Sequence, residues 1–174
     1  MASVAEHLVH QLEGAGVRHI YGIVGDSLNP VVDAVRRSKK IRWIHVRHEE
    51  TAAFAAAAEA EITGQLAVCA GSCGPGNLHL INGLYDANRS HLPVLAIASH
   101  IPTSQIGTGF FQETHPDRIF DECSVFSEMI SSSEQVPRVT RSAIQQALSN
   151  HGVAVLTLPG DIADMEVSLS LIHI

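Results

Sequence analysis

Two adjacent carboxylates, Glu49 and Glu50, stand between an apolar run and an alanine-rich segment in the stretch "VRHEETAAFAAAAEAE". A carboxylate in the first turn of a helix gains about 0.3–1 kcal/mol from the helix dipole, which explains either residue without any chemistry. Because both follow an apolar strand, one of them has to point toward the apolar edge of the sheet. An unpaired buried carboxylate costs several kcal/mol, so that residue is expected to be protonated or paired with a ligand. The pattern leaves open which of the two turns inward.

A glycine-rich turn, "GSCGPGN" from Gly71 to Asn77, is the second candidate for chemistry. It follows an apolar strand and opens a helix, so its backbone N–H groups can face an anion. It lacks the lysine and the serine or threonine of a P-loop, so nucleoside triphosphates are not expected ligands. Gly74 and Gly76 have no Cβ atoms, which lets a flat ring lie against the backbone. The alternative interpretation is an ordinary turn between a strand and a helix.

The cysteines and the eleven histidines show no metal-ligand pattern. An odd number of cysteines, Cys69, Cys73 and Cys123, favours a reducing compartment over a disulfide framework. Cys69 and Cys73 lack the usual two-residue spacing of a zinc ligand pair, and no second ligand pair stands nearby. We therefore expect no metal site in the chain.

Apolar, strand-like runs alternate with helical patterns along the chain. Strands are predicted over residues 19–25, 41–46, 65–70, 92–99 and 153–159, with a weaker strand over 126–130. Helices are predicted over residues 3–15, 27–37, 49–62, 78–90 and 135–150. Ser27 or Asn29 is the expected N-cap of the second helix. The alternation predicts an α/β fold, doubly wound, with a mainly parallel sheet of about six strands and helices on both faces.

Ligands of such sheets gather at the carboxyl ends of the strands. The turns at Gly25, at His48–Glu49, at Gly71–Asn77 and at Ser99–His100 are all expected at that edge. The two candidate motifs are therefore predicted to lie near each other.

The composition excludes several classes of function. The length of 174 residues suits one domain, and the 45% hydrophobic content suits a well-buried core. A formal charge of −7 without a basic run makes nucleic acid and anionic membranes poor partners. The first residues lack the basic and apolar regions of a secretion signal, so a cytoplasmic location is expected.

Three motifs, "YGIVGDSLNP", "GPGNLHLINGLYDA" and "GFFQETHP", carry a resemblance to a known family. With the run from Arg47 to Pro102, they make the chain resemble the N-terminal pyrimidine-binding domain of thiamine diphosphate enzymes. It is most similar to pyruvate oxidase and the quinone-linked, FAD-containing pyruvate dehydrogenase of bacteria. The likeness extends from about Val4 to Asp161, and we predict that residues 1–161 form this domain.

The resemblance implies that Glu49 is the catalytic glutamate and that Glu50 is structural. In this family the glutamate hydrogen-bonds N1′ of the aminopyrimidine and favours the imino tautomer of its 4′-amino group. That group then removes the thiazolium C2 proton, and the resulting ylid attacks a 2-oxo acid, from which CO₂ leaves. The resemblance further implies a set of cofactor-binding residues, Val24, Gly25, Glu49, Gly74, Pro75, Gly76 and Asn77, and two substrate-side residues, Phe111 and Gln112.

The resemblance also implies partners outside this chain. Mg²⁺ with the diphosphate group, and FAD, are expected to be bound by central and C-terminal domains that this sequence lacks. The chain is then half of a composite site in a homo-oligomer, a dimer or a tetramer, and inactive alone. Pyruvate is the expected substrate, with a quinone or oxygen as electron acceptor; a quinone-linked enzyme can lie peripherally at the inner membrane. The alternatives are an acetolactate synthase-type carboligase or a non-catalytic α/β binding module.

Residues 162–174 are predicted to be a truncated tail. The last six, Leu169 to Ile174, match the translation of a transposon end used in preparing sequencing libraries, so we expect them to be partly non-native.

Overall fold

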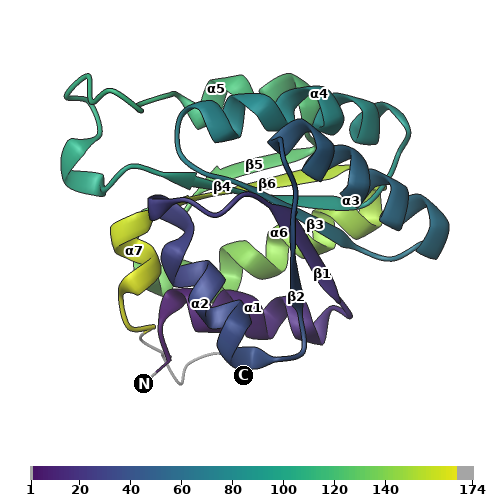
Figure 1. Cartoon of the computed structure of the whole chain (residues 1–174), viewed down its shortest axis with the longest axis horizontal. Helices are drawn as coiled ribbons and strands as arrows, with labels where there is room; N and C mark the ends of the chain where they lie inside the picture. The colour runs from purple at the N-terminus through teal and green to yellow at the C-terminus, as the bar shows by residue number, and fades with distance from the viewer. Residues whose placement is uncertain (1, 168–174) are drawn as a thin grey trace.

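Six parallel strands form one sheet, in the order β2-β1-β3-β4-β6-β5, in the computed structural model, which describes residues 2–167 (Figure 1). The strands are β1 (His19–Gly22), β2 (Arg42–His45), β3 (Ala67–Gly71), β4 (Val94–His100), β5 (Phe126–Met129) and β6 (Val153–Pro159). The helices are α1 (Val4–Gly14), α2 (Asn29–Ser38), α3 (Glu49–Thr63), α4 (Pro75–Arg89), α5 (Pro116–Ile119), α6 (Val136–Asn150) and α7 (Gly160–Asp164). The predicted doubly wound α/β fold is confirmed, including the weak strand that became β5.

Helices cover both faces of the sheet, and each face has its own apolar core (Figure 1). Helices α1, α2, α6 and α7 pack on one face, and α3, α4 and α5 pack on the other. Strand β4 illustrates why the central strands are continuously apolar. Its residues Leu95 and Ile97 belong to the first core, whereas Val94, Ala96 and Ala98 belong to the second. Alternate side chains of one strand therefore fill both layers, as in other buried parallel sheets.

Helices α3 and α4 lie side by side over one face of the sheet and pack unusually closely (Figure 1). The alanines of α3 face the core, and Gly83 of α4 sits directly against this helix. A Cβ atom at Gly83 would come within 2.5 Å of the Cβ of Ala53 and 2.9 Å of the backbone nitrogen of Phe54. Small side chains on both helices are therefore required for this packing distance, which positions the first turns of α3 and α4 relative to each other.

The predicted cap of α2 was wrong. Helix α2 begins at Asn29 after a short 3₁₀ turn, Asp26–Leu28, and its N-cap residue Leu28 makes no side-chain cap hydrogen bond. The hydroxyl of Ser27 instead bonds to the hydroxyl groups of Ser72 and Ser99, at 3.0 and 2.6 Å. A contact with residues far along the chain has replaced the local capping contact that the sequence suggested.

The predicted end of the domain at residue 161 falls inside helix α7. Val167 is buried, and its backbone nitrogen donates to the carbonyl of Ala2 at 3.0 Å, so residues 162–167 pack with the domain. The predicted non-native residues, 169–174, lie outside the described part of the chain. Within residues 2–167, no helix combines the length and the apolar character that crossing a lipid bilayer requires.

The close packing at Gly83 gives a stability prediction. Gly83→Ala inserts a methyl group where Ala53 and the α3 backbone leave no room, so the free energy of unfolding should fall by about 1–3 kcal/mol. Urea denaturation followed by circular dichroism measures this change. Gly14→Ala is the matched control, because a Cβ there meets nothing within 4 Å. Equal unfolding free energies of the two variants would contradict the packing argument.

Candidate functional site

Glu49 is the first residue of α3 and is only 7% exposed. His48 occupies the N-cap position with extended backbone, and its Nδ1 accepts a hydrogen bond from the backbone nitrogen of Glu50 at 3.3 Å. This cap determines where the helix begins and therefore which glutamate faces the sheet edge. Of the two adjacent carboxylates, it is Glu49 that turns inward.

The carboxylate of Glu49 is held by a histidine from the neighbouring helix. Its Oε2 lies 3.0 Å from Nδ1 of His79, which is on α4. The ring of His79 stacks on that of His48, with centroids 4.3 Å apart and planes inclined by 28°. The other oxygen, Oε1, faces Gly76, where an added Cβ would lie 3.2 Å away. One oxygen of Glu49 is thus engaged by an imidazole and the other lies against bare backbone.

Glu50 has a different environment. It is half-buried, and its Oε1 accepts a hydrogen bond from Nδ2 of Asn82 at 2.8 Å. That bond ties the start of α3 to the exposed side of α4. A structural role for Glu50 agrees with this contact.

The glycine turn is shaped by close approaches that exclude side chains. Gly74 has φ +69° and ψ −118°, and a Cβ there would lie 3.1 Å from Gln112. A Cβ at Gly71 would come within 2.7 Å of the carbonyl oxygen of Gly76. A Cβ at Gly25 would lie 2.5 Å from the hydroxyl of Ser72. The loops after β1 and β3 therefore touch, as the predicted pocket requires of Gly25 and Gly74–Gly76.

Three serines beneath this turn form a hydroxyl chain that sequence reasoning missed. Ser99 donates to the carbonyl of Gly71 at 3.1 Å, so Ser27 has to donate to Ser99 and Ser72 to Ser27. The backbone nitrogen of Cys73 also donates to the Ser27 hydroxyl, at 3.1 Å. The chain links the turns after β1 and β3 to the end of β4. No local sequence pattern indicates this chain, because the three serines are 27 to 72 residues apart in the sequence. Only the fold brings them together.

Asn77, one of the predicted cofactor-binding residues, is fully buried. Its Nδ2 donates to the carbonyl of Ser99 at 2.7 Å, while its Oδ1 has no hydrogen-bond partner among the described residues. Its amide thereby fixes the first turn of α4 to the end of β4.

The remaining predicted residues lie toward the outside. Val24 is 50% exposed and Phe111 is 83% exposed. Gln112 accepts a weak hydrogen bond from the Sγ of Cys73 at 3.5 Å and lies against Gly74. Phe111 and Gln112 line a cavity of about 970 Å³ that Glu49 does not reach. The predicted residues therefore divide into a group around Glu49 and Gly76 and a group along this cavity.

His48, Glu49 and His79 are the one set of metal-compatible side chains found within residues 2–167, with donor atoms all within 4.8 Å of one another. The Nδ1 atoms of both imidazoles already have protein partners, the backbone nitrogen of Glu50 for His48 and Oε2 of Glu49 for His79.

His100, the last residue of β4, is the other titratable group buried at this edge. It is 2% exposed, and its Nδ1 has no hydrogen-bond partner among the described residues. Burial lowers the pKa of its imidazole below the usual value and outweighs the opposing effect of the Glu113 carboxylate. His100 is therefore neutral in the folded protein at neutral pH.

Comparison with known proteins identifies the domain. Residues 2–120 match the family model described as "Thiamine pyrophosphate enzyme, N-terminal TPP binding domain". The chain belongs to this family. Its buried Glu49 and the bare backbone at Gly76 thus form part of a thiamine pyrophosphate binding domain.

Three relatives each contain a segment that is similar to this domain. An "Uncharacterized 42.6 kDa protein in isoamylase 3'region" of Pseudomonas amyloderamosa is 62% identical over 92% of this chain and 40% of its own length. Pyruvate oxidase of Lactiplantibacillus plantarum is 41% identical over 89% of this chain and 26% of its own. Acetolactate synthase isozyme 1 large subunit of Escherichia coli is 35% identical over 91% and 28%. The chain therefore spans well under half of the length of these relatives.

The neutral state of His100 gives a pH prediction. The pKa of His100 is lower in the folded than in the unfolded chain. Its contribution to the free energy of unfolding is therefore fully present above pH 6.5 and is lost as pH falls through the pKa of the folded state. His100→Gln should lose less unfolding free energy than the wild type over that acidic interval. Urea denaturation at a series of pH values measures the difference.

His45→Gln is the matched control, because it removes one exposed histidine and leaves His100 in place. A His100→Gln curve parallel to the wild type would mean that this imidazole titrates normally in the folded protein.

Proposed function

We propose that this chain is the pyrimidine-binding part of a thiamine diphosphate enzyme that oxidatively decarboxylates pyruvate to acetate and CO₂. Glu49 is the residue that exchanges a proton with the bound cofactor. The observation that carries this proposal is the buried carboxylate of Glu49, with one oxygen 3.2 Å from the position of a Cβ at Gly76.

The residues around Glu49 fit an aminopyrimidine ring. The absence of a side chain at Gly76 lets Oε1 of Glu49 lie close to the backbone of the glycine turn, since an added Cβ would stand 3.2 Å from that oxygen. Low exposure keeps water from competing for that oxygen, so a hydrogen bond to a ring nitrogen is stronger there than in solvent. When bound, thiamine diphosphate supplies the electron sink for decarboxylation. Glu49 holds or gives up a proton at its Oε1, and His79 keeps its Oε2 in place.

The other parts of the proposed enzyme lie beyond this chain. Mg²⁺ and FAD would be bound by further domains, since the relatives are several times longer than the matched segment. Pyruvate as substrate is supported by the 41% identity to a pyruvate oxidase. Electrons would pass through FAD to a quinone or to oxygen, in a homo-oligomer whose second subunit completes the site.

Carbon–carbon bond formation is the second candidate function, because acetolactate synthases are 35% identical over 159 residues. The two reactions have different products and different electron balances. Incubating the full enzyme with pyruvate under anaerobic conditions distinguishes them. Acetate with stoichiometric flavin reduction supports pyruvate oxidation, whereas acetolactate without net flavin reduction supports the carboligase.

The catalytic assignment is tested by two neighbouring substitutions in the full enzyme that contains this chain. Glu49→Gln keeps the shape but removes the exchangeable carboxyl proton, so kcat should fall by about 10²-fold or more. Glu50→Gln keeps an acceptor oxygen for Asn82 and should change kcat little. Steady-state kinetics with pyruvate measures both. Equal losses, or a larger loss in Glu50→Gln, would mean that Glu49 is not the proton-exchanging residue.

A further inference from the structure

Residues 103–113, between β4 and α5, form a loop that contributes part of the lining of the cavity of about 970 Å³. Phe110, Phe111 and Gln112 of this loop line the cavity. A Cβ at Gly74 would lie 3.1 Å from the Cβ of Gln112, so Gln112 lies directly against the glycine turn. The loop thus contributes both a wall of the cavity and a contact with the glycine turn.

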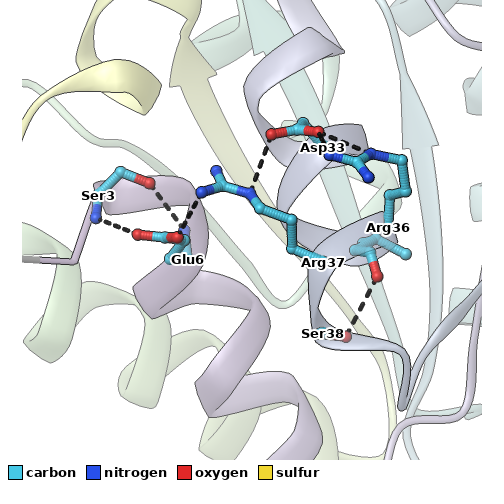
Figure 2. A network of polar contacts seen from close by, with 7 residues as sticks. Ser3, Glu6, Asp33, Arg36, Arg37 and Ser38 are labelled. Atoms are coloured by element: carbon cyan, nitrogen blue, oxygen red, sulfur yellow. Dashed lines mark hydrogen bonds and ion pairs between the residues drawn. The ribbon is translucent and has the colours of Figure 1, made fainter.

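Other parts of the cavity lining are fixed by helices. Arg37 of α2 lies between Glu6 of α1 and Asp33 of its own helix, at 2.8 and 2.9 Å (Figure 2). All three residues line the cavity and belong to helices that pack in the core. These ion pairs therefore join two elements that are already held in place.

The loop has no such support. Among the described residues, the hydrogen bonds of residues 104–111 connect only to residues 102–113. Gly107 and Gly109 have φ angles of +84° and +75°, and a Cβ at either position would meet nothing within 4 Å. Around these two glycines, the loop conformation is therefore held by hydrogen bonds within the loop rather than by packing.

The carboxylate of Glu113 supplies the contacts that fix the two glycines. Its Oε1 accepts a hydrogen bond from the backbone nitrogen of Gly107, and its Oε2 accepts one from that of Gly109 at 2.8 Å. The hydrogen bond from Gly107, with a smaller contribution from Gly109, lowers the pKa of the Glu113 carboxyl below its usual value. Glu113 is therefore charged at neutral pH, and hydrogen bonds to a charged acceptor are stronger than those between neutral groups.

Glu113 is not part of the cavity lining, so its influence on a bound molecule has to pass through its neighbours. Phe111 and Gln112 directly precede it in the sequence. Without the carboxylate, a turn with two glycines gains many conformations, because glycine has the greatest backbone freedom. A cavity wall that is ordered for only a fraction of the time weakens ligand binding by that fraction.

We propose that Glu113 is a positioning residue that holds Phe111 and Gln112 in place for substrate binding. Its carboxylate closes the loop at Gly107 and Gly109, and the loop in turn presents these two side chains to the cavity. The inference rests on the proposed function, because it takes pyruvate as the molecule that meets this wall.

Hydrogen exchange of the full enzyme that contains this chain tests the hold on the loop. Glu113→Ala removes both acceptor oxygens, so peptides covering residues 105–112 should exchange at least about threefold faster, while peptides of α3 and α4 keep the wild-type rate. Glu113→Gln keeps one acceptor oxygen but places an amide nitrogen at the other position, so its exchange rate should lie between the two. Unchanged exchange in Glu113→Ala would overturn the proposal, whatever products the enzyme forms.

Steady-state kinetics with pyruvate tests the role in binding. In Glu113→Ala the KM should rise by about fivefold or more, while kcat should change by less than about twofold, because Glu49 is untouched. Glu61→Ala removes an exposed carboxylate on α3 and is the matched control, with both parameters retained. An unchanged KM, or a loss confined to kcat, would contradict the positioning role. A wild-type enzyme that does not turn over pyruvate would instead overturn the proposed function, and the exchange measurement separates these two failures.

Discussion

The contact between α3 and α4 is the constraint on which the geometry around Glu49 depends. Gly83 has no side chain because the α3 backbone at Phe54 occupies the space a Cβ would need. The first turns of the same two helices carry Glu49 on one side and Gly76 and His79 on the other. A wider helix spacing would separate the carboxylate from the imidazole, whose atoms are 3.0 Å apart. Packing in the core thus sets a distance at the edge of the sheet.

The sheet explains why these two helix ends meet at all. Strands β2 and β3 are parallel, with β1 between them, so the helices that follow them both begin at the carboxyl edge. Two helix N-termini then stabilise negative charge on Glu49 by about 0.3–1 kcal/mol each, which is less than the cost of burying it. The contact with His79 offsets part of that cost and holds the carboxylate of Glu49 in place.

The sheet and the helices that cover it were predicted well, because strands and helices both show a local periodicity in the sequence. Continuous apolar strands, alternating with helices, are enough to indicate a parallel sheet, and the place of both glutamates after β2 indicates only that one of the two is buried. The choice between Glu49 and Glu50 depended on His48 acting as N-cap, which cannot be read from composition. Ser27 was assigned to a cap because its true partners, Ser72 and Ser99, are distant along the chain. Tertiary hydrogen bonds overrode a local preference at that position.

His79 was missed although a signal for it was present. Gly76, His79 and Gly83 follow one another at spacings of three and four residues, so they share one face of α4. That face lies toward α3, which brings the imidazole of His79 within 3.0 Å of Glu49 although His79 is 45% exposed. Reading the glycines as a contact face, rather than as part of a phosphate-binding turn, therefore leads to the histidine that contacts the carboxylate of Glu49.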